Sequence, residues 1–568
     1  MRPVLLALAG FLLLTLAFPT TVVRPAAMSS GGTLRLYTMA QYPLPSGASG
    51  PSQITSDKSG RIWFVEQGSN QVGSYDPASK SFFEFPIPTA NALPEGIAVD
   101  PAGSVWFTEL TPNGLGVLFP SNGTIREVTI PPAPDGIACG PIGVTPQGNG
   151  SIWVACEFSD QIDEYVPSLG ILKQFDLPVP FSAPLQILFD RSGNFWFTAA
   201  DSGMLGYATT GQLRPGTTDG IQEFAPLNST YLTTIENPLL PSGRVITSLA
   251  IPSQIAFSPD GGSLWVSEHG SGSFDRYDIG PKTLAKYFTS TPSSSLYTQS
   301  LPNGIAVDPS GYVWVAEHYG NRIAEFDPTT GTMVEYPIPC CKSEVAAALY
   351  LTTGPNGTIW FSENIGNAIG ELSLSAKAVP FEIELAPGAA SIGTSGKVVV
   401  SVTVAGGSEA GGQNGTLAFR AEGVSRDGAL ENLSATFVPA AMNLNGTTGT
   451  ATLTLVSSGL SPGAYYVTVG ATSETGLISS SILKLTVSQG FQYWWALAVG
   501  LIVLISLVVA LFARLARSRR RRHATSALQR RGPVTPLVRQ NTVRGRRRAP
   551  LSWRWQRSKA GWRQAEVC

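Results

Sequence analysis

Residues Leu301 to Pro339, LPNGIAVDPSGYVWVAEHYGNRIAEFDPTTGTMVEYPIP, contain the unit that decides the fold of this 568-residue chain. Four apolar or alternating runs, GIAVD, YVWVAE, NRIAEFDP and TMVEYPIP, are separated by turns that contain Asp-Pro or Gly. Short runs of this kind between turn residues indicate β-strands joined by hairpins. The unit is therefore predicted to form one four-stranded antiparallel sheet.

The same unit recurs along the chain. Three copies are plain: PSQITSDKSGRIWFVE from Pro51, LPEGIAVDPAGSVWFTE from Leu93 and PSQIAFSPDGGSLWVSE from Pro252. Looser copies are PIGVTPQGNGSIWVACE, APLQILFDRSGNFWFTAA and LYLTTGPNGTIWFSE. With the opening unit, these give seven repeats.

One tryptophan marks the second strand of each repeat. These residues are Trp63, Trp106, Trp153, Trp196, Trp265, Trp314 and Trp360. Their spacing is 43 to 49 residues except for one interval of 69, which predicts an insertion near residues 208–250. Four strands per repeat at this period are typical of a β-propeller with one blade per repeat. The predicted fold is therefore all-β, with a seven-bladed propeller over residues 33–375.

The two ends of the repeat array predict how the propeller closes. The last repeat stops near Leu374, after three strands, whereas the segment Thr38 to Pro45, TMAQYPLP, matches TMVEYPIP of the sixth repeat. We expect the N-terminal segment to supply the missing outer strand of the seventh blade, which would leave no open sheet edge there.

A secretory signal is predicted at residues 1–27. Arg2 provides positive charge, Val4 to Phe18 is an apolar run of fifteen residues, and small residues follow at Ala26 and Ala27. This run is short for a membrane span, which favours a cleaved signal peptide over an uncleaved anchor, the alternative interpretation.

The composition changes after the propeller. Residues 379–488 are rich in Thr, Val, Ser, Ala and Gly, and contain strand-like runs such as KVVVSVTV and SILKLTV. This pattern predicts an immunoglobulin-like β-sandwich that serves as a stalk. Residues 493–513, YWWALAVGLIVLISLVVALFA, carry no charge and are predicted to form one transmembrane helix of about 31 Å.

The predicted cytoplasmic tail, residues 514–568, is strongly basic. It holds 17 Lys or Arg and one acid, Glu566, whereas the rest of the chain holds 21 basic and 38 acidic residues. Positive charge after the apolar segment places the C-terminus in the cytoplasm and the propeller and sandwich outside, as a single-pass cell-membrane protein. We expect the tail to contact anionic lipids, and we expect no nucleic-acid partner.

Cysteines and glycosylation motifs agree with an extracytoplasmic location. Cys139 and Cys156 lie at ends of two strands that an antiparallel pairing would bring together, which predicts a disulfide. Cys340 and Cys341 are adjacent and could bond to each other or stay free. Seven Asn-x-Ser/Thr motifs fall outside the tail, at Asn122, Asn149, Asn228, Asn356, Asn414, Asn432 and Asn445.

A glutamate closes the second strand of most repeats. We assign six of them, Glu66, Glu109, Glu157, Glu268, Glu317 and Glu363, with Ala199 in the fourth repeat. One hypothesis is a carboxylate ring at the mouth of the channel that binds Mg²⁺ or Ca²⁺, chiefly through Glu109, Glu268, Glu317 and Glu363. The alternative is that each carboxylate accepts backbone N–H groups inside its own blade.

The two histidines before the tail interrupt this repetition. His269 follows Glu268 and His318 follows Glu317, at equivalent places in neighbouring repeats. They could bind a metal or act as a catalytic base, and they could equally be surface residues in loops.

The repeat motif also resembles a known family. Gly-Ile-x-x-Asp-Pro-x-Gly-x-x-Trp-Phe-Thr-Glu, clearest at Gly96 to Glu109, and Asn-x-Ile-Gly at Asn367 to Gly370 look like the streptogramin B (virginiamycin B) lyase family. More loosely, they are similar to NHL-repeat and gluconolactonase-like propellers. The resemblance implies a lyase in which a His directly before one Gly-Ile abstracts a proton. It also implies Mg²⁺, held by a carboxylate two residues before that His and by another that ends a second strand.

No repeat has a histidine at that position. The residues there are Ser52, Glu95, Gly140, Leu185, Ser253, Asn303 and Leu349, and Leu301 stands where the first carboxylate would be. The sequence therefore favours a binding module for an extracellular glycan, peptide or protein, with Glu66, Glu157, Glu95 and Asn303 as binding residues. The alternative is a Mg²⁺-dependent lyase or a lactonase-like hydrolase at the channel mouth.

Overall fold

The computed structural model describes residues 35–225, 235–236, 245–246, 251–270, 272–290, 300–339, 346–378, 381–406, 415–425, 428–429, 433–444, 448–474, 477–488, 502–515 and 517. The chain forms two compact units, residues 1–490 and 491–568. The predicted signal peptide, the Cys340–Cys341 pair and the tail beyond residue 517 lie outside the described residues.

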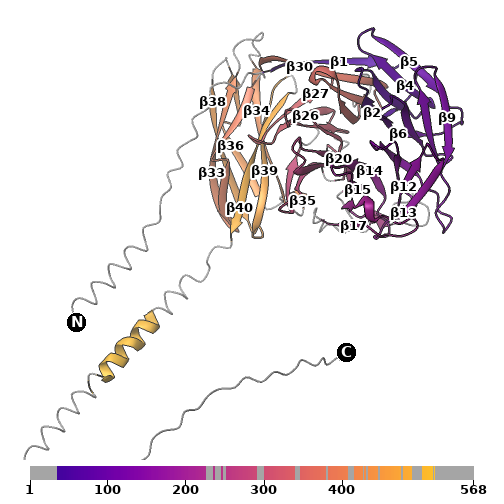
Figure 1. Cartoon of the computed structure of the whole chain (residues 1–568). Helices are drawn as coiled ribbons and strands as arrows, with labels where there is room; N and C mark the ends of the chain where they lie inside the picture. The colour runs from indigo at the N-terminus through magenta and orange to yellow at the C-terminus, as the bar shows by residue number, and fades with distance from the viewer. Residues whose placement is uncertain are drawn as a thin grey trace, which may run out of the picture. The chain divides into compact units, whose positions relative to one another are not determined.

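Seven groups of four antiparallel strands follow one another along the chain (Figure 1). Six of them are separate sheets, and the sixth in chain order belongs to a larger sheet. Blades one and two are β2 (Pro51–Ser56), β3 (Ile62–Glu66), β4 (Gln71–Asp76) and β5 (Ser81–Pro86), then β6 (Pro94–Val99), β7 (Val105–Glu109), β8 (Gly114–Phe119) and β9 (Thr124–Thr129). Blades three and four are β10 (Pro141–Pro146), β11 (Ile152–Cys156), β12 (Gln161–Val166) and β13 (Ile171–Asp176), then β14 (Pro184–Phe189), β15 (Phe195–Ala199), β16 (Met204–Ala208) and β17 (Ile221–Phe224). Blades five and six are β20 (Pro252–Phe257), β21 (Ser263–Glu268), β22 (Ser273–Asp278) and β23 (Thr283–Phe288), then β24 (Pro302–Val307), β25 (Val313–Glu317), β26 (Arg322–Asp327) and β27 (Thr332–Pro337).

Blade seven closes the ring in the predicted way. Its strands β28 (Ala348–Thr353), β29 (Ile359–Glu363) and β30 (Ala368–Ala378) are completed by β1 (Arg35–Pro43), which pairs with β30 as the outer strand. The first strand of each blade contacts the first strand of the next, and β28 of blade seven contacts β2 of blade one. The sheets therefore form a closed ring, as predicted for a propeller.

The turn after the first strand, which is Asp-Pro-x-Gly in blades two and six, positions the tryptophan of its blade. In blade two, Asp100 Oδ1 accepts the backbone N–H groups of Ala102 (2.8 Å) and Ser104 (2.9 Å), and Oδ2 accepts the indole N–H of Trp106 (3.0 Å). Gly103 takes φ +89°, which favours glycine. One aspartate thus fixes both the turn and the tryptophan rotamer.

The predicted insertion begins inside blade four. The 3₁₀ turn η1 (Thr210–Gln212) lies between β16 and the outer strand β17, and the short pair β18 (Ile235–Glu236) and β19 (Val245–Ile246) follows β17. The rest of residues 226–250 lies outside the described residues.

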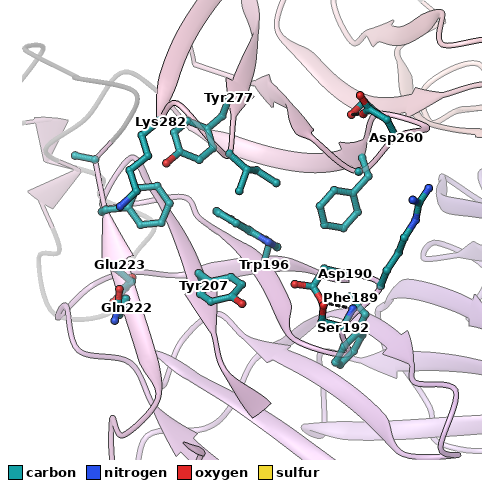
Figure 2. Close-up of a pocket in the computed structure, with 17 residues that line it drawn as sticks. Phe189, Asp190, Ser192, Trp196, Tyr207, Gln222, Glu223, Asp260, Tyr277 and Lys282 are labelled. Carbon is teal, nitrogen blue, oxygen red and sulfur yellow. Dashed lines mark hydrogen bonds between the residues drawn. The ribbon is translucent and has the colours of Figure 1, made fainter. Parts of the chain in front are cut away.

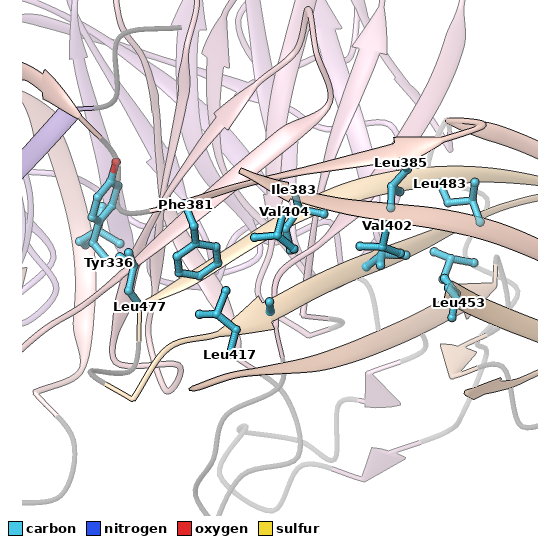
Figure 3. Close-up of a cluster of buried hydrophobic side chains, with 14 of the residues drawn as sticks. Tyr336, Phe381, Ile383, Leu385, Val402, Val404, Leu417, Leu453, Leu477 and Leu483 are labelled. Atoms are coloured by element: carbon cyan, nitrogen blue, oxygen red, sulfur yellow. The ribbon is translucent and has the colours of Figure 1, made fainter. Parts of the chain in front are cut away.

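Residues after the propeller form two further layers of strands. One sheet has the order β31 (Phe381–Ala386), β33 (Ser395–Gly406), β38 (Gly449–Ser458), β36 (Leu433–Val438). The other has the order β40 (Ile478–Ser488), β39 (Gly463–Thr472), β34 (Gly415–Ser425), β35 (Gly428–Ala429), with β32 (Ala389–Gly393) on β40 and β37 (Ala441–Leu444) on β34. Apolar side chains of both sheets, among them Val402, Leu453 and Leu483, share one buried cluster (Figure 3).

The second layer joins the propeller directly. Strand β40 pairs antiparallel with β27, so blade six and the second sheet are continuous. The buried cluster also includes Tyr336 of β27, labelled in Figure 3, and Trp314 of β25. The sequence patterns did not predict this shared sheet.

The predicted transmembrane segment is described in part. Residues 493–501 lie outside the described residues, and residues 502–515 are helical, with exposed side chains such as Ile502 and Phe512. No described helix has both the length and the apolar character needed to cross a bilayer.

Three of the predicted glycosylation motifs can be placed. Asn122, Asn149 and Asn356 are exposed and lie in turns between strands. Asn228, Asn414, Asn432 and Asn445 lie outside the described residues.

Candidate functional site at the propeller axis

The strand register corrects one sequence assignment. In every blade, the first residue of the first strand pairs with the last residue of the second strand, as Pro51 does with Glu66. In blade three, Pro141 pairs with Cys156, so Glu157 follows the strand and does not end it. The prediction for Glu157 was wrong by one residue. The last residue of the second strand lies three positions after the tryptophan in every blade, and in blade three this residue is Cys156. A glutamate ends the second strand in five blades.

The same register changes the channel-facing position in blade three. Position two of the first strand is Ser52 in blade one and Glu95 in blade two, and in blade three it is Ile142. Gly140, named from the sequence, precedes the strand.

Blade three has a disulfide where other blades have a glutamate. Cys139 and Cys156 are bonded, as the sequence predicts, and both are buried. Together with Asp163, these cysteines are the only cluster of three His, Cys, Asp or Glu ligand groups among the described residues. Since both sulfurs are in the disulfide, the cluster does not fit a metal ion.

The five strand-ending glutamates are buried in their own blades. Their side chains are at most 1% exposed. The Ser69 hydroxyl donates to Glu66 (2.7 Å), the Gln41 amide donates to Glu363 (2.7 Å), and Arg322 lies 3.8 Å from Glu317. Burial agrees with glutamates held inside their own blades better than with a solvent-lined ring. The partners Ser69, Gln41 and Arg322 are side chains, however, and not the backbone N–H groups that the alternative expects.

Burial makes several of these carboxyls hard to ionise. Desolvation raises the pKa of Glu109 and of Glu363 to about 7. It raises the pKa of Glu268 to about 8, where buried Asp275 adds to the effect and Lys286 opposes it. Neither carboxyl oxygen of Glu268 has a hydrogen-bond partner among the described residues. Glu268 is therefore largely protonated at neutral pH.

The two histidines form a pair between blades five and six. His269 Nε2 and His318 Nδ1 are 3.1 Å apart, and the His318 ring stacks on Tyr319. Desolvation lowers the pKa of His269 to about 4. Desolvation and the neighbouring His269 lower the pKa of His318 to about 3. Both rings are neutral at pH 7, and one must donate to the other.

Glu95 is the centre of a polar network on the first strands. Its carboxylate accepts hydrogen bonds from the hydroxyls of Ser52 (2.8 Å) and Tyr350 (3.2 Å) and from the amide of Gln67. Burial is the main cause that raises its pKa, and the bonds from Ser52 and Tyr350 oppose the rise. Blades one, two and seven thus meet at one carboxylate.

Asn303 extends this network through blades five and six. Its side-chain oxygen accepts from the Ser253 hydroxyl (2.6 Å), and its amide donates to the Leu349 carbonyl (3.0 Å). Burial, and the negative charges of Glu95 and Glu157 to a smaller extent, raise the pKa of Tyr350. We call Ser52, Glu95, Ser253, Asn303 and Tyr350, with Gln67, the axial cluster. Among these, sequence reasoning assigned roles to Glu95 and Asn303 alone.

A second set of polar groups lies at the same face, one residue after each second strand. Gln67, Glu157, His269, His318 and Asn364 occupy this position in five blades, and each is half-buried. The sequence contains a signal for this set, because each residue lies at the same distance after the tryptophan of its blade. The sequence prediction placed the site at the preceding glutamates, which are buried.

The residues present do not fit the Mg²⁺ site that the resemblance implies. Asn303 replaces the base, Leu301 replaces the first carboxylate, and Glu317 lies inside blade six beside Arg322. Glu109, Glu268, Glu317 and Glu363 lie in four separate blades and form no common ligand cluster among the described residues. These side chains therefore support no catalytic step through a metal.

Several solved structures are similar to this chain. A streptogramin B lyase structure is 27% identical, covers 60% of this chain and 98% of its own, and has a TM-score of 0.48. Virginiamycin B lyase from Staphylococcus aureus is 23% identical, with 60% and 100% coverage and a TM-score of 0.48. A gluconolactonase from Xanthomonas campestris is 14% identical, with 62% and 99% coverage and a TM-score of 0.33.

No curated protein matches the chain. The model of the virginiamycin B lyase family matches residues 32–214 and 242–402, which is more than half of the chain and includes strands of all seven blades. The chain therefore belongs to the virginiamycin B lyase family.

Proposed function

We propose that this chain is a binding module for an extracytoplasmic ligand. The ligand would lie at the axial cluster and at the polar residues that follow the second strands, Gln67, Glu157, His269, His318 and Asn364. The observation that carries the proposal is the absence of a histidine before Gly-Ile in every blade. The groups that stand there, Ser52, Glu95, Ser253 and Asn303, are hydrogen-bonded to their neighbours. Such groups can orient a ligand through hydrogen bonds. None of them is the imidazole that would act as the base in a lyase.

The histidine pair supports binding over proton abstraction. A general base works best with a pKa near the pH at which it acts. Burial instead lowers the pKa of His269 to about 4 and of His318 to about 3. Neutral imidazoles of this kind are weak bases and serve as hydrogen-bond donors and acceptors.

A peptide fits the axial face better than the other ligands expected. Glu95 and Glu157 offer carboxylates for N–H donors, whereas Ile142, Leu185 and Leu349 offer apolar surface at the equivalent positions of three other blades. A mixed lining of this kind suits a chain with both amide groups and apolar side chains. A glycan or a protein ligand is the other expected outcome.

We infer an arrangement at the cell surface from the sequence. The layers after residue 381 would be an immunoglobulin-like stalk, residues 493–513 a single membrane span, and the basic tail a contact for anionic lipids on the cytoplasmic side. The signal at residues 1–27 and the glycosylation motifs belong to the same proposal.

The binding test uses a displayed random-peptide library against the full-length chain. The Glu95→Gln variant serves for counter-selection, and Glu384→Gln, an exposed change in the sandwich, is the matched control. We expect enriched peptides that bind the native chain and the control, and that bind Glu95→Gln at least about tenfold more weakly. Failure to enrich any peptide, or equal binding to all three proteins, would contradict the proposal.

Quinupristin tests the alternative, an enzyme of the lyase type. A catalytically inactive virginiamycin B lyase from Staphylococcus aureus was solved with this compound. It is 24% identical to this chain and covers 60% of this chain. The full-length chain is incubated with quinupristin and Mg²⁺, Ca²⁺ or EDTA, and products are separated by chromatography because an elimination conserves mass. We expect no linear product. A cation-dependent product would establish the lyase alternative.

A further inference from the structure

A cavity of about 820 Å³ lies between blades four and five, away from the axial cluster (Figure 2). One wall comes from blade four and includes Phe189, Asp190 and Trp196, and the other comes from blade five and includes Asp260 and Tyr277. Its volume is within the range of small-molecule sites, about 300–1,000 Å³.

A short outer strand borders the cavity. Strands β5, β9, β13, β23 and β27 have six residues each, whereas β17 of blade four has four. Its pairing with β16 covers only Leu205 to Ala208. The edge of blade four therefore leaves Tyr207 and Phe224 half-buried beside the cavity.

One hydrogen bond of the repeat is missing at this place. In blades one, two and six, the indole N–H donates to the turn aspartate, at 2.9, 3.0 and 3.1 Å. Blade four keeps both residues, and Asp190 Oδ1 still accepts the N–H groups of Ser192 (2.8 Å) and Asn194 (3.0 Å). In the part of the chain that the structure describes, however, no bond joins Trp196 to Asp190.

Both unmatched groups line the cavity. Trp196 packs instead against Tyr207, Phe224 and Tyr277, with ring centroids 4.9, 5.9 and 6.0 Å away. Figure 2 shows its indole and the Asp190 carboxylate on the same side of the cavity. The site thus offers an indole N–H donor, a carboxylate acceptor and several aromatic edges.

We propose that this cavity binds a sugar, as a site distinct from the axial one. A pyranose carries hydroxyls that can donate to Asp190 and accept from Trp196, and C–H faces that pack on Tyr207 and Phe224. A purely apolar ligand would leave the carboxylate oxygen and the indole N–H unpaired, which is unfavourable. The lining carries three carboxyl groups, Asp190, Glu223 and Asp260, against two cations, Arg191 and Lys282, so no excess of positive charge favours an anion.

The strand topology separates this site from the axial cluster. The axial residues lie at the start of the first strands, as Glu95 and Asn303 do. The cavity is lined by the turns after the first strands, at Asp190 and Ser258, which lie at the other end of each blade. Loss of one site therefore leaves the other in place, and the two proposals can fail independently.

The test measures binding of four trisaccharides, maltotriose, cellotriose, chitotriose and mannotriose, to the full-length chain. The chain is kept in a detergent without a sugar headgroup, and binding is followed by saturation-transfer NMR and calorimetry. Two variants address the site: Asp190→Asn keeps the turn acceptor and replaces Oδ2, and Trp196→Phe removes the indole N–H. Asp100→Asn and Trp106→Phe are the matched controls in blade two, where these groups bond to each other.

We expect at least one trisaccharide to bind the native chain and both controls. Its affinity for Asp190→Asn and Trp196→Phe should fall about tenfold or more. The proposal is overturned if no trisaccharide binds the native chain, or if the two site variants bind as well as their controls. Glu95→Gln should bind the sugar normally whatever the outcome of the peptide test.

Discussion

At the scale of single residues, this propeller buries carboxyl groups inside its blades whose pKa values lie near neutral pH. Glu109, Glu268 and Glu363 occupy equivalent places, and burial raises the pKa of each to about 7 or 8. A carboxyl with a raised pKa binds its proton more tightly in the folded state than in the unfolded state. Its stabilising contribution is full below the unfolded pKa, near 4.5, and is lost as the pH rises through the folded value.

Replacing Glu268 by Gln should remove one such dependence. Glutamine resembles the protonated acid and cannot ionise, so the variant should gain stability relative to the native chain as the pH rises from about 5 to about 9. We expect a relative gain in melting temperature of roughly 3 to 6 °C over that range. Calorimetry at several pH values would measure it.

Glu384→Gln, at an exposed site in the sandwich, serves as the control. A pH-independent difference between Glu268→Gln and the native chain would show that Glu268 is already ionised when buried. A relative loss of stability at high pH would lead to the same conclusion.

At the scale of elements, a packing pair between the second and third strands recurs in three forms. In blades one, two, four and seven, a phenylalanine faces a glycine, as Phe107 faces Gly116. A Cβ added to Gly116 would overlap the Phe107 ring. In blade six the same pair is Val315 and Ala324, and in blades three and five a valine faces an aspartate. Ring and missing side chain therefore compensate each other in the four blades that have the Phe–Gly pair.

The pair predicts a rescue in blade two. Gly116→Ala should destabilise the chain by about 1 to 3 kcal/mol, because the new methyl group overlaps the ring of Phe107. Adding Phe107→Val recreates the blade-six pair and should recover part of the loss, with a coupling energy of about 1 kcal/mol or more. Denaturant unfolding of the native chain, both single variants and the double variant measures the coupling. Additive effects would refute it.

The repeats explain which elements could be predicted from the sequence. Every blade carries its own turn and tryptophan, so blade number, strand order and the closing strand β1 follow from local pattern. The assignment in blade three was wrong by one residue, because Cys156 takes the glutamate position and Glu157 follows it. Of the axial cluster, the sequence singled out Glu95 and Asn303 alone. The contacts within the cluster could not be predicted, since that between Glu95 and Tyr350 joins residues 255 positions apart.

At the scale of the whole molecule, the propeller and the following layers share a sheet. Met333 of β27 pairs with Ser480 of β40, and Thr468 of β39 donates to the Phe288 carbonyl of blade five (3.2 Å). The buried cluster continues from Tyr336 into the sandwich at Phe381. Neither the propeller repeat nor the strand pattern after it predicts this junction. The sequence of an outer blade strand does not indicate whether a further strand pairs with it. We infer that the two domains unfold together.

Ser480 offers a direct test of this coupling. It is fully buried where β40 meets β27, so Ser480→Asp places a charge there without a partner. Ser488→Asp, at the exposed end of the same strand, is the matched control and should change the melting temperature by less than about 1 °C. We expect the native chain and the control to melt in one calorimetric transition. Ser480→Asp should lower the melting temperature by several degrees or split the transition in two. Two transitions in the native chain itself would show that the shared sheet does not couple the domains, and the layers after residue 381 would then act as an independent stalk.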